Sequence, residues 1–529
     1  MPNRESQSET SVRGIAPRSP PPSGTDKVII IGGGMAGLSC GCYLQMNGFQ
    51  TEILEMGATA GGLCAAWDRG PYLFDGCLQW LLGTHPASAF HQIWTELGAI
   101  AGRKILNHHE FIRIEGADGQ ALSVVGNLDK LAAEFKRIAP EDAALIDQLL
   151  RAAQRCAPME PPIEKLVELM TPLEKLRTGL RYLPMLPVVF RWKKLPITTY
   201  LARYRNPFLR EALMVLAGHE RASALVLVMV LALRSRNNTG YVAGGSRALA
   251  QAIANRYTSL GGRLRYNTAV AAVTVENGRA TGVRCADGKS VPATTVVSCA
   301  DGHTTIFKML GGRFVDKDIL LAYHTCETFP ALIQISLGIN ATFPEAPHTL
   351  NLPLSRPLKV DDATRHSRIE VTIYPSNSGL CPDGKTVMTI RFSGRCEYWV
   401  NLRNNSPERY KSEKENILRE VVGILDRRFP GLAQNLENSD LASPATFVRY
   451  TGNWQGSYEG WLPTPRILGR RLPRSLPGLE GFYMAGHWVE PGGGLPLAAL
   501  SGRCVAQLIC ARSGRTFAAT TPQGTEPIT

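Results

Sequence analysis

The sequence lacks the features of several large protein classes. Its twelve cysteines form no C-x-x-C pair and no regular framework. They therefore indicate reduced, mostly buried thiols in a cytoplasmic protein. Long hydrophobic runs are also missing, since the longest, Ala222–Leu233, has twelve residues and is too short to span a bilayer. We expect this run to be a buried helix; the wall of a hydrophobic tunnel is the alternative.

Both ends of the chain lack periodic hydrophobicity. Residues 1–26 are rich in Ser, Pro, Arg and Glu and contain no apolar stretch of the kind found in a signal peptide. We expect a disordered lead-in there and a flexible tail over residues 513–529. No cluster of metal ligands stands out by spacing, and His108-His109-Glu110 indicates a solvated junction between a loop and a strand. We therefore predict no metal site.

Composition places the chain among ordinary globular proteins. Of its 529 residues, 44% are hydrophobic and 19% are charged, and the length predicts two domains that interleave. The formal net charge of +13 indicates an acidic surface as a partner but does not distinguish lipid from nucleic acid.

The stretch Lys27–Glu55 organises the chain. A β-branched run, Val28–Ile31, predicts a buried parallel strand, and a helical pattern runs from about Met35 to Asn47. Between them three glycines follow the G-x-G-x-x-G spacing, namely Gly32, Gly34 and Gly37. The first permits a tight turn, the second lets a pyrophosphate approach the backbone, and the third lets the helix pack closely on the strand. Met35 and Ala36 begin the helix, whose N-terminus offers N–H groups to that pyrophosphate.

A second predicted strand, Thr51–Leu54, ends in Glu55, eighteen residues beyond Gly37. A carboxylate at this place binds ribose hydroxyls and argues against a 2′-phosphate, which favours FAD or NAD. Strand, glycine triplet, helix, strand and acid all fall within one βαβ unit. A dinucleotide site is therefore favoured over a purely structural turn.

A second pair of glycines, Gly61-Gly62, is placed to bring backbone N–H groups to the same pyrophosphate. The triplet, the acid and this pair together resemble the N-terminal signature of a large family of FAD-dependent oxidoreductases with the amine-oxidase type of fold. The family includes amine oxidases, phytoene desaturases, carotenoid isomerases and retinol saturases. Where Arg or Ser commonly follows the double glycine, this chain has Leu63-Cys64 and then FDGCLQWLLG at Phe74–Gly83. These residues indicate a less characterised desaturase-like branch with noncovalent FAD.

The end of the chain carries the most specific resemblance. The sequence AGHWVEPGGGLPLAALSGR, residues 485–503, is similar to the C-terminal flavin motif of phytoene desaturases and carotenoid isomerases. We expect a strand, a glycine loop at 491–494 and a helix from about Leu495 to Cys510, with its N-terminus directed at the pyrimidine edge of the flavin. The resemblance assigns these residues to the flavin: Gly486, Gly493, Gly494 and Leu495. In the middle of the chain it assigns Val270 to the adenine end through backbone hydrogen bonds.

The resemblance implies an α/β fold in which a Rossmann-type FAD-binding domain interleaves with an α+β substrate domain. The FAD-binding parts are residues 27–130, 240–310 and 476–512. The insert at 131–239 is predicted to be helical. Alternating runs such as Leu332–Leu337 indicate antiparallel strands with one apolar face in a second insert, 311–475. The substrate domain thus combines a mixed antiparallel sheet with a helical cap.

Between Lys175 and Arg210, nine residues are basic and none is acidic. Apolar and aromatic residues such as Phe190 and Trp192 are interleaved with them, and the prolines at 184, 187 and 196 exclude one long helix. Basic heads beside apolar side chains suit an anionic lipid surface, where each Lys or Arg contributes about 1 kcal/mol. We therefore predict that residues 175–210 attach the protein peripherally to an anionic membrane; a solvated face of the cap is the alternative. No recognition motif for nucleic acid accompanies the charge, so we expect no nucleic-acid partner.

The chain has one dinucleotide fingerprint and no second one to hold NADPH, so electrons leave the flavin to oxygen, a quinone or another acceptor, or enter it by transient reduction. The flavin performs the difficult step, while the protein orients the substrate and excludes water. His487 and Glu490 lie near the flavin motif as candidates for acid–base catalysis; support of the glycine loop is their alternative role. We expect four further residues to line the substrate cavity: Gln79, Trp80, Tyr241 and Trp488.

We predict an oxidoreductase that desaturates, isomerises or saturates carbon–carbon bonds of an apolar polyene or isoprenoid delivered from a membrane. An amine or amino-acid oxidase is the first alternative. Members of that group often bind flavin through a C-terminal cysteine or form an aromatic cage, but the glycine loop here has no cysteine and only Trp488 nearby. A non-enzymatic, prenyl-binding relative such as a Rab GDP-dissociation inhibitor is the second alternative. The intact glycine triplet, Glu55 and the GGG loop argue against it.

Overall fold

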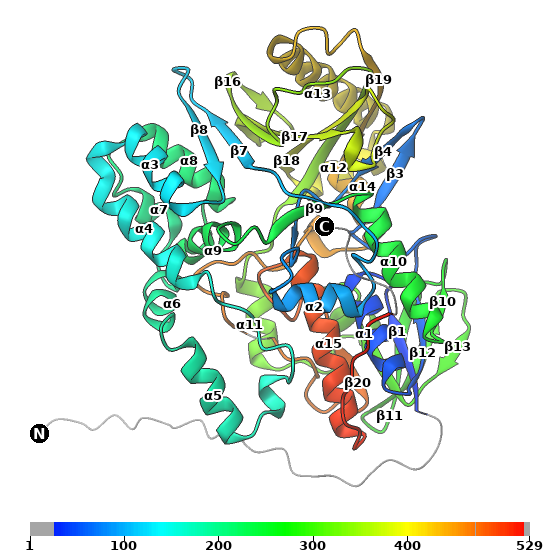
Figure 1. The fold of residues 1–529 in the computed structure, drawn as a ribbon. Helices are drawn as coiled ribbons and strands as arrows, with labels where there is room; N and C mark the ends of the chain where they lie inside the picture. The colour runs from blue at the N-terminus through cyan, green and yellow to red at the C-terminus, as the bar shows by residue number, and fades with distance from the viewer. Residues whose placement is uncertain (1–25, 471, 523–529) are drawn as a thin grey trace, which may run out of the picture.

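Five parallel strands form the centre of the nucleotide-binding part of the molecule (Figure 1). The computed structural model describes residues 26–470 and 472–522, so the predicted tail at residues 1–26 lies outside them except for Asp26. The strand order is β10-β2-β1-β14-β20. Their bounds are β1 Lys27–Ile31, β2 Gln50–Leu54, β10 Arg263–Arg265, β14 Thr295–Ser298 and β20 Phe482–Met484. Three distant parts of the chain thus meet in one sheet, which confirms the interleaved α/β fold.

Alternate residues of these strands pack into two separate cores. Val28 and Ile30 pack with the helices α1 Met35–Met46, α10 Gly245–Ser259 and α15 Gly494–Arg512. Ile29 and Ile31 belong to the core on the opposite face. That face is covered by a small antiparallel sheet of β11 Val270–Glu276, β12 Arg279–Cys285 and β13 Ser290–Pro292. Because both faces are covered, the β-branched run of β1 is buried throughout.

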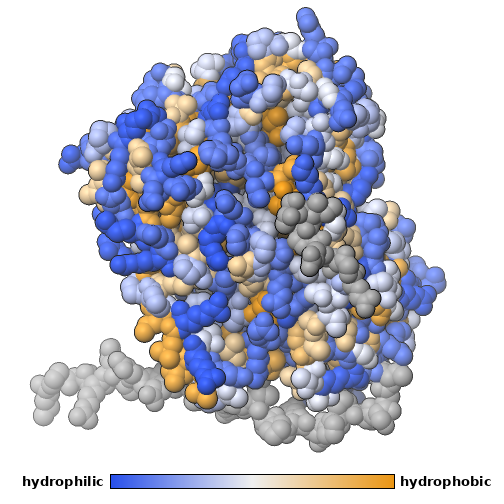
Figure 2. All heavy atoms as spheres, viewed as in Figure 1, coloured by the Kyte–Doolittle hydropathy of each residue, from blue (hydrophilic) through white to orange (hydrophobic). Residues whose placement is uncertain are grey.

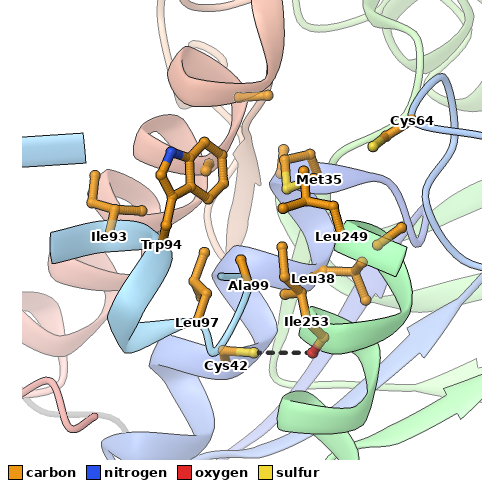
Figure 3. Packing of buried hydrophobic residues seen from close by; sticks show 14 of the residues in the cluster. Met35, Leu38, Cys42, Cys64, Ile93, Trp94, Leu97, Ala99, Leu249 and Ile253 are labelled. Carbon is orange, nitrogen blue, oxygen red and sulfur yellow. Dashed lines mark hydrogen bonds between the residues drawn. The ribbon is translucent and has the colours of Figure 1, made fainter. Parts of the chain in front are cut away.

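Helix α1 lies between two other helices of its core (Figure 3). Apolar residues from all three meet there: Met35, Leu38 and Cys42 from α1, Ile93 and Trp94 from α2 Ala89–Glu96, and Leu249 and Ile253 from α10. The Cys42 thiol donates to the Ile253 carbonyl oxygen at 3.8 Å. On another side α1 packs against α15, where the Ser39 hydroxyl donates to the Ala499 carbonyl oxygen at 2.7 Å. The start of α1 is therefore held rigidly against the sheet.

Helix α15 is, within the described part of the chain, the only helix long and apolar enough to cross a membrane. In the structure, 67% of that apolar window is buried inside the protein. Its Arg503 forms a buried ion pair with Glu96 of α2, and Glu96 also accepts a hydrogen bond from Tyr43 of α1 at 2.6 Å. These contacts make α15 a core helix. Seven of the twelve cysteines are buried, as predicted.

A seven-stranded sheet forms the centre of the predicted substrate domain, in the order β19-β15-β18-β17-β16-β7-β8. Its strands are β7 Glu110–Glu115, β8 Ala121–Val125, β15 Ala331–Ile339, β16 Thr349–Lys359, β17 Arg365–Pro375, β18 Thr386–Gly394 and β19 Leu436–Ala442. Neighbours are antiparallel except for β16 and β7. One face, with Ile335, Val371 and Ile390, packs against α12 Cys396–Asn405 and α13 Pro407–Arg428. Strands β7 and β8 belong to this sheet, although the sequence-based division places residues 27–130 in the FAD-binding domain.

A helical cap with its own core fills residues 128–234 (Figure 1). Its helices are α3 Leu128–Ile138, α4 Ala143–Cys156, α5 Pro172–Tyr182, α6 Leu186–Lys193, α7 Ile197–Leu201, α8 Pro207–Ala217 and α9 Ala224–Arg234. The apolar run predicted to be a buried helix is α9, and its Leu227 and Leu231 lie in the core of the cap. The basic segment 175–210 is divided among α5 to α8, as its prolines predict.

Short elements connect these parts. They are the hairpin β3 Ala66–Arg69 and β4 Tyr72–Asp75, the small sheet of β5 Leu81–Leu82, β6 Ile105–Leu106 and β9 Thr239–Val242, and the helices α11 Lys317–Thr325 and α14 Pro444–Thr451. Residues 513–522, predicted to be flexible, are instead docked on α1. The Phe517 ring lies 5.7 Å from that of Tyr43, and Arg515 donates to the Asn47 carbonyl oxygen at 2.8 Å. Residues 523–529 lie outside the described residues.

Candidate functional site

The first glycine turn lies where β1 passes into α1. Gly32 has a φ of +96°, which favours glycine, and its Cα faces the backbone of Cys299 just after β14. A Cβ on Gly37 would overlap the Gly32 carbonyl oxygen, so glycine at 37 permits the close packing of α1 on the strand. The turn opens at the carboxyl ends of β1 and β14. In open parallel sheets this position between adjacent strands binds nucleotides.

At position 34, neither a positive φ nor close packing requires a glycine. Its φ is −75°, which any residue adopts, and a Cβ there would meet no protein atom closer than 3.8 Å, the Gly61 carbonyl oxygen. Neither the backbone nor the packing of the protein therefore requires a glycine at 34. The space beside it is what a pyrophosphate needs in order to reach the N–H groups at the start of α1.

The second glycine turn faces the first. Gly61 has a φ of +121°, and its N–H donates to the Gly33 carbonyl oxygen at 2.9 Å. A Cβ on Gly62 would lie 3.2 Å from the Cα of Gly34. The predicted Gly61-Gly62 turn is thus held directly against the N-terminus of α1, with Met35 and Ala36 buried beneath it.

Glu55 is buried at the end of β2 and bound on both carboxylate oxygens. Its Oε2 accepts from Gly33 N–H at 2.6 Å and its Oε1 accepts from Gly57 N–H at 2.7 Å. A carboxylate has about four lone-pair sites, so it can accept two further hydroxyls. The Thr268 N–H donates to the Glu55 carbonyl oxygen at 2.8 Å, which brings the start of β11, with Val270, beside the acid.

The third glycine loop reaches the same region through the packing of α15 on α1. The Gly486 N–H donates to the Ser501 hydroxyl at 2.9 Å, and a Cβ on Gly486 would touch that of Ala36 at 3.6 Å. Gly493 and Gly494 both have a positive φ and lie just before and at the start of α15, followed by Leu495. Residues predicted to bind one cofactor from both ends of the chain are thereby brought together.

Gln79 and Trp80 lie on a loop fixed by Asp75, whose Oδ1 accepts from the N–H groups of Cys77 and Leu78 at 2.9 Å each. Gln79 reaches the substrate sheet, where its amide donates to the Thr372 hydroxyl at 2.8 Å. The Gln79 carbonyl oxygen lies 3.1 Å from the Nε2 atom of His348, and the His348 ring lies 6.3 Å from that of Tyr241. Three of the four predicted cavity residues thus lie together.

Trp488, the fourth, lies elsewhere. Its ring centroid is 5.3 Å from that of Trp461 and 6.4 Å from that of Tyr323, in the core on the other face of the parallel sheet. The two catalytic candidates also have structural surroundings. Glu490 forms an ion pair with the buried Arg474. His487 lies against Gly460, and burial lowers the pKa of its ring to about 4.

Sequence reasoning missed the group that lies nearest the third glycine loop. A Cβ on Gly493 would lie 2.6 Å from the Cβ of Glu459, so this side chain borders the loop directly. Burial raises the pKa of Glu459 to about 7, against the lowering influence of Arg391. A carboxyl with such a pKa can hold or release a proton near neutral pH. Glu459 does not follow a predicted strand or lie in a motif, so the sequence gives no signal that it belongs to the site.

It also missed the polar face of the substrate sheet. Side chains directly opposite one another on adjacent strands form two rows: Gln334, Arg391, Glu370 and Asn351, and beside it Ser336, Thr389, Thr372 and Thr349. The Gln334 amide donates to the Asp75 carbonyl oxygen at 2.8 Å, so this face lies beneath the loop that carries Gln79. The alternation with apolar residues was visible, but a polar face is usually solvated; here Gln334 is fully buried.

His108 also differs from its prediction. It was expected to be solvated, but it stacks on His348 with ring centroids 3.8 Å apart. Burial lowers the pKa of His348 to about 3. Within the described residues no group of three or more His, Cys, Asp or Glu side chains is arranged to hold a metal ion.

Comparison with known proteins identifies the family. A family model described as flavin containing amine oxidoreductase matches residues 35–510. This chain belongs to that family. Phytoene desaturase (neurosporene-forming) of Rhodobacter capsulatus is 25% identical over 519 residues, which cover 92% of this chain and 94% of the desaturase. The chloroplastic prolycopene isomerase of Arabidopsis thaliana is 27% identical over 296 residues, 54% of this chain and 48% of the isomerase, so that match spans about half the isomerase.

Solved structures share the fold of this flavin-containing oxidoreductase. Putrescine oxidase bound to putrescine covers 92% of this chain with 99% of its own, at a TM-score of 0.57 and 16% identity. An oxidoreductase from Methanosarcina mazei covers 90% of this chain with 99% of its own, also at a TM-score of 0.57 and 16% identity. At these identities the likeness shows the fold alone.

The protein is an FAD-dependent oxidoreductase, and its residues fit the cofactor. The unfilled space at Gly34 matches the pyrophosphate, and the remaining acceptor sites of Glu55 match ribose hydroxyls. When bound, FAD supplies the site with an acceptor and donor of electron pairs. The assignment of individual residues to parts of FAD stays a prediction.

Proposed function

We propose that this flavoprotein desaturates, isomerises or saturates carbon–carbon bonds of an apolar polyene or isoprenoid. The observation that carries the proposal is the 25% identity to a phytoene desaturase across nearly the full length of both chains. The prolycopene isomerase match supports the same substrate class over about half its length. The only G-x-G-x-x-G fingerprint that opens a βαβ unit is the one at residues 32–37. This supports an external electron acceptor, such as oxygen or a quinone, for desaturation, and an external electron donor in place of bound NADPH for saturation.

Within this proposal the chain's own residues have distinct tasks. The three glycine turns hold and orient the cofactor, and the loop at Gln79 and Trp80 covers the substrate beside it. Glu459 replaces Glu490 as the candidate for holding or moving a proton, since it borders Gly493 and has a pKa of about 7. Glu490 is instead paired with Arg474, so we assign it to support of the glycine loop.

An amine oxidase is less well supported. Trp488, the aromatic residue that would begin a cage, packs away from Gln79 and Trp80 in a separate core. The loop at 491–494 has no cysteine for a covalent flavin bond.

Turnover assays separate these activities. The FAD-loaded protein is incubated with phytoene or a poly-cis carotene in liposomes, and separately with putrescine and other amines, with oxygen or a quinone as acceptor. We expect the carotene to change its number or geometry of double bonds and the amines to remain intact. Oxidation of amines with unchanged carotene would contradict the proposal.

Peripheral attachment to a membrane is part of the proposal, and helix α5 supports it. Four leucines form one stripe along this helix, each more than half exposed: Leu173, Leu176, Leu180 and Leu183. Figure 2 shows an apolar patch over α5 on the lower part of the visible face. Arg177 and Arg181 flank the stripe, and no residue of α5 is buried. An amphipathic helix with basic flanks suits the surface of an anionic bilayer.

On its other side α5 borders a cleft of about 540 Å³, which separates it from residues 86–92 at the start of α2. The helix therefore stands away from the body of the protein, with its stripe facing outward. Phe190 of α6 is also exposed, at 67%, but Trp192 is not available for membrane contact. Its ring packs 4.6 Å from that of Tyr200, so the predicted role of Trp192 is wrong.

Vesicle binding tests the attachment. The double variant Leu176→Gln/Leu180→Gln should lose most binding to anionic vesicles at every salt concentration. Arg177→Gln/Arg181→Gln should lose roughly 2 kcal/mol, or about thirtyfold, and only at low salt. Tyr450→Gln, at a residue 64% exposed on α14, is the control for loss of an exposed ring. Equal binding of all variants would leave α5 as a solvated face of the cap.

A further inference from the structure

The polar face of the substrate sheet is unusual for a site that takes a pure hydrocarbon. A chain of charged groups crosses it. Glu459, beside the third glycine loop, interacts with Arg391, which lies directly opposite Glu370 on the adjacent strand. Glu370 in turn interacts with Arg234 at the end of α9. The chain of charges leads from the glycine loop toward the cap.

Several donors on and around this face have no partner. Within residues 26–470 and 472–522, twelve side chains carry buried polar atoms that find no hydrogen-bond partner, and five of the twelve lie on or around this face: His108, Arg234, Tyr241, Thr389 and Arg391. All of them can donate a hydrogen bond. Buried polar groups in native proteins are nearly always satisfied, so a concentration of unmatched donors points to an absent acceptor.

Arg234 gives the strongest evidence for an absent hydrogen-bond acceptor. It is 6% exposed, and both its Nε and Nη1 atoms lack a partner among the described residues. Its guanidinium lies against two nearly perpendicular rings, 5.0 Å from the centroid of Trp80 and over the ring of Phe111. Burial lowers the pKa of the Arg234 guanidinium, and Glu370 opposes this shift only through a longer-range interaction.

These donors suit a substrate oxygen atom that accepts hydrogen bonds. The planar guanidinium of Arg234 is fixed by stacking, which leaves its N–H edge free for a bidentate or paired hydrogen bond. The rings of His108 and Tyr241 both lie close to that of His348, with centroids 3.8 and 6.3 Å from it, so their donors belong to the same part of the site. A hydrocarbon would leave every one of these donors desolvated and unpaired, which disfavours its binding.

We propose that the substrate of this site is a polyene or isoprenoid that carries a carbonyl or carboxylate oxygen at one end, bound by Arg234 with Tyr241 and His108. The inference rests on the proposed function and narrows its substrate class from apolar polyenes to oxygenated ones. The hydrocarbon part lies between the nucleotide-binding domain and the cap, and the oxygen end lies beneath Trp80.

Binding to the FAD-loaded protein tests this without turnover. The probes are four all-trans C20 polyenes with one conjugated chain, ending in a methyl, hydroxymethyl, aldehyde or carboxyl group. Quenching of tryptophan fluorescence reports their binding. We expect the aldehyde or the acid to bind at least about tenfold more tightly than the methyl compound. A preference for the acid alone identifies a carboxylate, and an equal preference for the aldehyde identifies a carbonyl.

Arg234→Met should abolish this preference while leaving binding of the methyl compound unchanged or stronger. Arg234→Lys keeps a cation without the planar fork and should keep only part of the preference. Arg210→Met, which removes an exposed arginine of the same cap, is the control. FAD content and melting temperature show that each variant is folded and loaded.

Four results would overturn the inference. Equal affinity for all four probes in the native protein would leave the proposed function standing but show that no oxygen is recognised. An unchanged preference in Arg234→Met would remove Arg234 from recognition, and loss of FAD from that variant would assign the guanidinium to the cofactor. Failure of the whole series to bind would contradict the proposed function as well, since it denies polyenes of either kind.

Discussion

Gly34→Ala separates cofactor binding from folding. The added Cβ would meet no protein atom closer than 3.8 Å, and the φ of −75° is ordinary for alanine. We therefore expect the free energy of unfolding of the FAD-free protein to change by no more than about 1 kcal/mol. The same Cβ occupies the space through which the pyrophosphate reaches the backbone N–H groups.

The expected loss of binding is large. If the pyrophosphate loses two charge-assisted hydrogen bonds of about 2 kcal/mol each, FAD affinity falls by roughly 4 kcal/mol, or about a thousandfold in Kd. Flavin fluorescence during titration of the FAD-free protein measures this Kd, and circular dichroism measures the melting temperature.

Gly37→Ala is the matched comparison. Its Cβ would overlap the Gly32 carbonyl oxygen, so this variant should lose stability as well as FAD. Native affinity in a folded Gly34→Ala protein would refute the reasoning, because the pyrophosphate would then not approach residue 34.

Five further predictions concern buried groups, the third glycine loop and the noncovalent binding of FAD. Between pH 4.5 and about 7 the folded protein keeps the proton of Glu459 that the unfolded chain loses, so native stability falls as pH rises. Glu459→Gln should therefore gain up to about 3 kcal/mol relative to the native protein at pH 8 but not at pH 4, measured by urea unfolding. For His487 the sign is opposite: its pKa of about 4 costs the native protein up to about 3 kcal/mol as pH falls from 6.5 to 4, and His487→Gln should abolish this loss. Glu96→Gln leaves Arg503 buried without its charge partner and should cost about 3–5 kcal/mol, whereas Glu480→Gln in an exposed pair should cost less than about 1 kcal/mol. The side chain of Gly493→Leu would collide with Glu459, so this variant should fold but retain FAD less tightly. Acid precipitation of the native protein should release all of its flavin into the supernatant. Flavin that stays in the pellet would contradict noncovalent binding.

The nucleotide-binding unit could be predicted closely because its signals are local. The strand at Val28–Ile31, the helix beginning at Met35 and the strand ending at Leu54 lie within one or two residues of their predicted bounds. Glycines with a positive φ, such as Gly32 and Gly61, could also be recognised from the local sequence pattern. These features depend on neighbours within about thirty residues.

Features set by tertiary packing could not be predicted, even where the two partners lie near each other in the sequence. Glu490 looked like a catalytic acid because the sequence does not show that Arg474 folds onto it. The hairpin of β7 and β8 joins the sheet through Leu350 and Asn351, far along the chain. Trp192 was expected at a membrane for the same reason, since its burial against Tyr200 is set by the tertiary packing of the cap.

The polar face of the substrate sheet shows most clearly what a sequence pattern cannot predict. Alternation in β15, β17 and β18 predicts two faces of opposite character but does not say which is solvated. The loop after Asp75 buries the polar face, and that loop is placed by contacts such as Gln334 to the Asp75 carbonyl oxygen. The sequence therefore does not show that the polar residues of these strands are buried in the site.

Lipid extracts from a polyene-producing host test the central claim most directly. The host expresses either the native protein or Gly34→Ala, and its polyenes are separated by chromatography and their absorption spectra compared. The account predicts that the native protein alone changes the number or geometry of conjugated double bonds. Identical polyenes in both strains, with the native protein folded and loaded with FAD, would contradict it.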